Sequence, residues 1–116
     1  MSFELTYDAI AKRIDHSLLG PALGTAELED GCRLAIRYAV ASVCIKPMAV
    51  ALAARILKGS GVAVGTTIGF PHGGHATAVK VFESRQAMAF ASVFGCLHEH
   101  LYERKQVVRR ERTRRL

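Results

Sequence analysis

The segment ASVCIKPMAVALAARILKGSGVAVGTTIGF, residues 41–70, decides the fold of this chain. It opens with the short apolar run of residues 41–45, which predicts a buried strand. Pro47 then suits the first turn of a helix over residues 48–57, because the N–H that proline lacks would have no helical partner there. Glycines end that helix, and the apolar run of residues 62–68 predicts a second strand.

Helices are predicted on both sides of this strand–helix–strand unit. Residues 4–13 favour a short helix, while the glycines and proline of residues 15–24 indicate a loop. A helix over residues 25–38 would have Thr as its N-cap and acidic residues in its first turn. Residues 70–74 fit neither element, and residues 76–88 favour another long helix. Strands that alternate with helices at this spacing pair in parallel, so the predicted fold class is α/β.

Each predicted helix has one apolar side. The side chains expected to face inward are Leu5, Ile10 and Ile14 around the first helix, Leu28, Cys32, Ala35 and Ile36 in the second, and Val79, Phe82 and Ala87 in the last.

The composition is that of one globular domain. The chain has 116 residues, of which 50% are hydrophobic and 22% are charged, a balance that excludes disorder. No apolar run reaches the roughly 20 residues of a membrane-spanning helix, and the first residues lack the pattern of a secretory signal. Three cysteines at no recognisable spacing do not indicate a disulfide framework, so a cytoplasmic location is expected.

Three segments of the chain resemble segments of one known family. Residues 14–19, Ile-Asp-His-Ser-Leu-Leu, are similar to the Ile-Asp-His-Thr-Leu-Leu opening of deoxyribose-phosphate aldolases. Residues 41–47, Ala-Ser-Val-Cys-Ile-Lys-Pro, resemble the first barrel strand of that family. Residues 68–74 and the helix with Lys80 and Glu83 that follows resemble its second strand, Gly-Phe-Pro loop and next helix. The order and spacing agree from about residue 8 to residue 89.

The resemblance implies a (β/α)8 TIM barrel, a fold of about 250 residues. This chain would hold an incomplete barrel: two parallel strands with flanking helices, plus a helical basic tail. Members of the family reversibly cleave 2-deoxy-D-ribose 5-phosphate to glyceraldehyde 3-phosphate and acetaldehyde in deoxyribonucleotide catabolism. They use a Schiff-base lysine, a partner lysine and a relay aspartate, without a metal or other cofactor. The implied partner is a small phosphorylated sugar.

The resemblance ends after Met88. The family continues with a strand that supplies the relay aspartate, whereas no aspartate follows Asp30 in this chain. The catalytic lysines would also lie on later strands, so no catalytic residue is expected here. We therefore expect residues 1–89 to be the N-terminal portion of an aldolase-type barrel and residues 90–116 to be a non-matching basic tail. As a truncated family member, the chain is expected to be inactive alone.

An incomplete barrel leaves a sheet edge without a neighbouring strand. Self-association through this open edge is therefore expected. Partial exposure is predicted for the side chains that would face the barrel interior, which we assign as Val43, Ile45, Val64 and Thr66.

The resemblance places Asp15, Ser17 and Cys44 in the substrate pocket. The residues alone leave other interpretations open. Asp15 fits a polar loop residue whose carboxylate accepts hydrogen bonds from nearby backbone N–H groups. Cys44 fits a small core residue in the same way. Lys46, at the end of its strand, is expected to be a solvated loop lysine and not the nucleophile.

Two other kinds of site are not supported by the spacing. Residues 69–74 have the glycine spacing of a phosphate-binding loop, but His75-Ala76 replaces its Lys-Ser/Thr, so these glycines are expected to serve turns with positive φ. The candidate metal ligands, which do not match a standard zinc pattern, are His72, His75, Cys96, His98 and His100. No metal is expected.

The basic charge lies mainly in the tail. Residues 1–89 carry nine Lys or Arg against seven Asp or Glu, and residues 90–116 carry seven against three. The arginine-rich residues 104–116 could contact nucleic-acid phosphates, although no binding fold accompanies them. A solvated helix is the preferred interpretation, and a non-catalytic basic binding protein is the alternative function.

Overall fold

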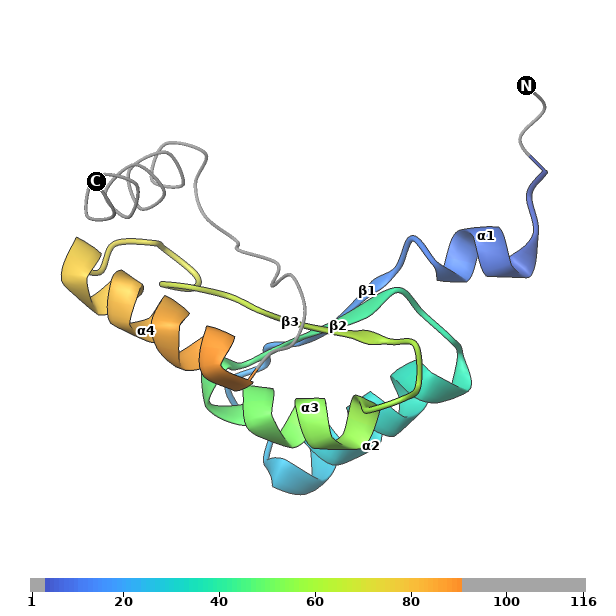
Figure 1. Cartoon of the computed structure of the whole chain (residues 1–116), viewed down its shortest axis with the longest axis horizontal. Coiled ribbons are helices and arrows are strands. Elements are labelled where there is room, and N and C mark those ends of the chain that lie inside the picture. Colours follow the sequence, from blue (N-terminus) through green and yellow to red (C-terminus); the bar gives the residue numbers. More distant parts are fainter. Residues whose placement is uncertain (1–3, 91–116) are drawn as a thin grey trace.

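Residues 4–90 of the chain are described by a computed structural model. They form a three-stranded parallel sheet in the order β1-β2-β3, with α2 and α3 side by side against one face (Figure 1). The elements are α1 (Tyr7–Ala11), β1 (Asp15–Leu18), α2 (Thr25–Arg37), β2 (Ser42–Ile45), the 3-10 turn η1 (Pro47–Ala49), α3 (Val50–Leu57), β3 (Ala63–Thr66) and α4 (Thr77–Phe90). Within this part of the chain, none of the helices combines the length and apolar character that crossing a bilayer requires.

The α/β fold class and the incomplete parallel sheet are confirmed, but the predicted count of two strands is wrong. The segment predicted as a loop begins with strand β1, which pairs in parallel with β2 from Asp15↔Ser42 to Leu18↔Ile45. The strand was missed because its sequence, Asp-His-Ser-Leu, has only Leu18 buried. Its extended form comes from pairing with β2, which the local pattern does not carry. The strand over residues 41–45 is accordingly the second in the sheet.

The hydrophobic core lies between the sheet and the helices α2 and α3. Val43, Ile45 and Val64 belong to it together with Leu28, Cys32 and Leu57. The prediction that Val43, Ile45, Val64 and Thr66 are partly exposed is therefore wrong, since their exposed fractions are 0%, 0%, 5% and 3%. The error is one of strand parity, because alternate residues of a strand point to opposite faces. These side chains lie on the helix-covered face of the sheet, and residues 42 and 44 take the other face.

Helix α2 follows its predicted apolar side in three of four positions. Leu28, Cys32 and Ala35 are buried. Ile36 is exposed because it lies one residue beyond Ala35, about 100° further round the helix and away from the core side.

 The helix begins after Gly24, one residue earlier than the predicted cap at Thr25, and the Glu27 carboxylate accepts the Gly24 N–H. An acceptor at this place satisfies one of the backbone donors that a helix start leaves free.

Helix α4 presents a different side to the protein from the one predicted. Ala87 is buried as expected, but Val79 and Phe82 are 53% and 64% exposed, and Lys80 is only 2% exposed. The helix carries apolar residues on two sides, so their spacing alone does not tell which side is covered. Val79 and Phe82 line a shallow hollow between α4 and the start of α3, together with Met48.

At the first helix, the structure is shorter and more exposed than predicted. Helix α1 covers only Tyr7–Ala11, and the Thr6 side chain caps it by accepting the Ala9 N–H at 3.2 Å. Leu5, Ile10 and Ile14, predicted to face inward, are 75%, 46% and 44% exposed. Apolar side chains around α1 therefore remain partly exposed next to the amino end of β1.

Gly31 in α2 allows the close approach of the helix to β1. A Cβ atom at this position would lie 2.3 Å from Cδ2 of buried Leu18. We predict that Gly31→Ala lowers the free energy of unfolding by about 1 kcal/mol, because overpacking (about 1–3 kcal/mol) outweighs the gain in helix propensity (about 1 kcal/mol). Urea denaturation measures the change. In a Leu18→Val background the same substitution should become neutral or stabilising, and a stabilising Gly31→Ala in the unaltered chain would contradict this packing.

Cys32 should make the free energy of unfolding decrease as the pH rises through the alkaline range. Burial raises the pKa of its thiol, an effect that Glu29 reinforces and Arg33 opposes. The stabilisation is complete below the ordinary thiol pKa of about 8.5, and it is lost as the pH rises from there through the raised folded-state pKa. We predict that the free energy of unfolding falls more steeply between pH 8 and pH 10 in the unaltered chain than in Cys32→Ala, as urea denaturation would measure. Equal slopes would rule out a linked thiol.

Candidate functional site

The predicted pocket residues share the sheet face that lies opposite α2 and α3. Asp15 and Ser17 alternate along β1, and their register partners on β2 are Ser42 and Cys44. Residues two apart on a strand point to the same face, and partners in register do so across strands. The structure thus brings Asp15, Ser17 and Cys44 to one surface, which we call the polar face together with Ser42. The local sequence pattern alone did not establish this arrangement.

Asp15 and Ser42 form the polar end of this surface. The Ser42 hydroxyl donates a hydrogen bond of 2.7 Å to Oδ1 of Asp15. Asp15 is exposed and is the first residue of β1, so the prediction that it lies in a loop is wrong. Its carboxylate is held across two strands by a neighbour that no local motif would identify.

Ser17 and Cys44 lie nearer the carboxyl ends of their strands. Ser17 is exposed, whereas Cys44 is only 3% exposed. In barrels of parallel strands, active sites form at the carboxyl face. This pair, one hydroxyl beside one thiol, is therefore the part of the polar face nearest to where barrel chemistry takes place.

Lys46 follows β2 at the carboxyl end of the sheet. Its ammonium group donates a hydrogen bond of 2.7 Å to the carbonyl oxygen of Leu23, in the segment between β1 and α2. The prediction of a solvated loop lysine is therefore wrong, because the side chain is partly buried and ties two loops together.

The segment after β3 is the loop that the sequence predicted, and two of its glycines have positive φ. Gly69 and Gly73 have φ of 65° and 64°, a conformation that side chains with Cβ rarely adopt. The N–H of Gly73 donates to the carbonyl oxygen of Gly69 at 2.6 Å, which closes a tight turn. A Cβ on Gly69 would also lie 3.0 Å from Cδ of Lys80. Phe70–Pro71, within the turn, is a cis peptide bond.

Two side chains of α4 hold this loop against the end of β3. The buried Lys80 ammonium donates to the carbonyl oxygen of Gly73 at 2.9 Å, and a Glu83 carboxylate oxygen accepts the Gly69 N–H at 2.7 Å. Hydrogen bonds to charged groups are stronger than those between neutral groups. Lys80 and Glu83 were noted in the sequence only as parts of a motif, and their three-residue spacing after a glycine-rich loop is the signal that could have assigned them this role.

The described residues hold no obvious metal centre. Within residues 4–90, no three His, Cys, Asp or Glu side chains gather closely enough to hold a metal ion. His72 and His75 are exposed in the β3–α4 loop. The other candidate ligands, Cys96, His98 and His100, lie outside the described residues, as does the arginine-rich tail.

No protein-family model matches the chain. Among curated relatives, the chain is 55% identical over 82 residues to deoxyribose-phosphate aldolase from Rhodopirellula baltica. These 82 residues are 71% of this chain and 34% of the relative. It is 50% identical over 80 residues to deoxyribose-phosphate aldolase from Clostridium perfringens. These 80 residues are 69% of this chain and 36% of the relative. The chain therefore spans about a third of the length of these curated relatives.

A solved structure supports the same fold. The tetrameric deoxyribose phosphate aldolase from Aeropyrum pernix superposes with a TM-score of 0.70 at 24% sequence identity, over 74% of this chain and 37% of that chain. At this identity the likeness concerns the fold alone. It agrees with a sheet of three parallel strands that forms part of a TIM barrel.

Glu83 should be a larger contributor to stability than its position on the helix surface suggests. We predict that Glu83→Gln lowers the free energy of unfolding by about 1–2 kcal/mol, because it weakens a charge-assisted hydrogen bond to Gly69. Arg85→Gln, an exposed site on the same helix, is the matched control and should change stability by less than about 0.5 kcal/mol. Urea denaturation compares the two. An equal effect of both substitutions would mean that Glu83 does not hold the loop.

Proposed function

We propose that this chain, whose residues from about 8 to 89 belong to the deoxyribose-phosphate aldolase family, contributes one wall of a phosphosugar pocket and does not catalyse aldol cleavage alone. The substrate of that pocket would be 2-deoxy-D-ribose 5-phosphate. The observation that carries the proposal is the parallel register of β1 and β2, which sets Asp15, Ser17 and Cys44 on one sheet face.

The three pocket residues have complementary chemistry. Asp15, already accepting a hydrogen bond from Ser42, can accept another from a sugar hydroxyl. Ser17 can donate as well as accept, and the Cys44 thiol supplies a small, weakly polar surface beside it. A wall of this kind can orient a polyol without reacting with it.

The lysines of the described residues support the absence of catalysis. Schiff-base formation requires an amine that is free to attack the substrate carbonyl. Lys12, Lys46 and Lys80 each donate to a backbone carbonyl oxygen, at 3.2, 2.7 and 2.9 Å. Lys58 follows α3 and precedes β3, so it lies toward the amino ends of the strands, away from the face where barrel sites form.

The remaining parts of the proposal concern location and association. We place the chain in the cytoplasm. Cys32 and Cys44 support this location, because neither forms a disulfide and disulfides are rare in that compartment. We also propose that the chain self-associates through an open sheet edge when nothing else covers it. The alternative of a basic binding protein depends on residues 104–116, outside the described residues, and the matched relatives give it no support.

The proposal predicts no aldolase activity in the purified chain. A coupled assay would follow glyceraldehyde 3-phosphate formed from 2-deoxy-D-ribose 5-phosphate, and borohydride trapping with mass spectrometry would detect a Schiff base. We expect neither product nor adduct, with the Rhodopirellula baltica aldolase as positive control. Turnover together with a trapped adduct on this chain would overturn the proposal, and Lys46→Met and Lys80→Met would then identify the nucleophile.

A further inference from the structure

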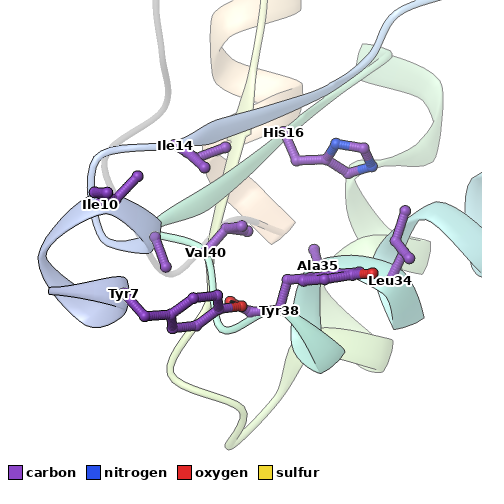
Figure 2. Close-up of a pocket in the computed structure, with 9 residues that line it drawn as sticks. Tyr7, Ile10, Ile14, His16, Leu34, Ala35, Tyr38 and Val40 are labelled. Atoms are coloured by element: carbon purple, nitrogen blue, oxygen red, sulfur yellow. Dashed lines mark hydrogen bonds between the residues drawn. The ribbon is translucent and has the colours of Figure 1, made fainter.

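An apolar groove runs beside β1, between α1 and α2. Its volume is about 220 Å³, and Tyr7, Ile10, Ile14, Leu34 and Tyr38 are among its lining residues (Figure 2). The exposed fractions of these five side chains run from 43% for Leu34 to 62% for Tyr7. Large apolar side chains gathered in one exposed hollow mark an interaction surface more often than isolated ones do.

The shape of the groove is fixed from both sides. The Tyr7 hydroxyl donates a hydrogen bond of 2.9 Å to the carbonyl oxygen of Tyr38, which ties α1 to the end of α2. Lys12 donates to the carbonyl oxygen of Val40 at 3.2 Å, which holds the other end of α1 against the start of β2. A groove braced in this way is preformed for an occupant.

The groove is continuous with an unpaired strand edge. In the sheet order β1-β2-β3, strand β1 has a neighbour on one side only within residues 4–90. His16 of β1 lies in the wall of the groove, and its buried Nε2 atom has no hydrogen-bond partner among the described residues (Figure 2). An occupant must therefore offer backbone groups to the edge and an apolar surface to the groove.

The groove also lies on the side of the sheet that the helices cover. His16 alternates with Ser17, so it shares the helix-facing side of the sheet with Leu18. In parallel sheets, the helix of a right-handed crossover packs on such a side. The space beside β1 is thus the place of a helix that accompanies one further parallel strand.

We propose that the β1 edge and the groove together receive a strand and its helix from the complementary part of an aldolase-type barrel. A closed barrel requires its first strand to pair with its last. The curated relatives are about three times as long as the matched segment, so they have the length for further strands beyond the three of residues 4–90. This inference rests on the family membership and not on the activity of the pocket. Self-association is what the same edge does when that segment is absent.

The test is co-expression of the full tagged chain with a fragment of the Rhodopirellula baltica aldolase that lacks the 82 matched residues. We expect a one-to-one complex by affinity purification and light scattering. Leu34→Asp, in the groove, should weaken it at least tenfold. Ile36→Asp, on the same helix and outside the groove lining, is the matched control and should weaken it less than twofold.

Each result decides the inference. No complex, or equal effects of Leu34→Asp and Ile36→Asp, would overturn it, as would a homodimer that Leu34→Asp dissociates and the fragment does not displace. Ile10→Asp, from α1, is a second groove variant, and circular dichroism of each variant verifies that it folds. This assay measures binding, and the coupled aldolase assay on the purified complex is a separate measurement. A complex that forms without aldolase activity would support the docking surface and count against the proposed pocket.

Discussion

Parallel strands satisfy their backbone groups only through neighbouring strands, and within residues 4–90 only β2 has a neighbour on each side. Everything else in the structure depends on this central strand. Its buried Val43 and Ile45 pack toward α2 and α3, and its Ser42 and Cys44 fix the positions of Asp15 and Ser17 on the opposite face. The outer edges of β1 and β3 remain the places where the described part of the fold is incomplete.

The polar face and the β3–α4 loop are positioned by different kinds of contact. Strand register alone aligns Ser17 with Cys44, whereas the loop depends on two charged side chains of α4. Lys80 is nearly completely buried, and a buried ammonium is tolerated only where acceptors replace its water. The carbonyl oxygen of Gly73 supplies one such acceptor. The loop and the helix therefore stabilise each other at the carboxyl end of the sheet.

The fold could be predicted from the sequence where hydrophobic pattern and turn chemistry coincide. The strands β2 and β3 and the glycine-rich loop have clear local signals, and the resemblance added the barrel. Strand β1 has no such signal, because three of its four residues are polar and none is β-branched. In α4, Val79 and Phe82 looked like core residues, but a helix with apolar residues on two sides takes its orientation from its neighbours. The candidate site was predictable as a set of residues, whereas the Asp15–Ser42 and Lys46–Leu23 contacts join segments far apart in sequence.

The central claim is that β1 is an edge strand of the sheet within residues 4–90, and that the groove beside it can bind a further strand and helix. Backbone amide hydrogen exchange on the full chain, followed residue by residue, tests this claim most directly. The amides of β2 should exchange slowest, because strands pair with it on both sides, and the amides of β1 that face away from β2 should exchange far faster. Protection of every β1 amide to the level of β2 would mean that the edge is already covered, and it would contradict the account.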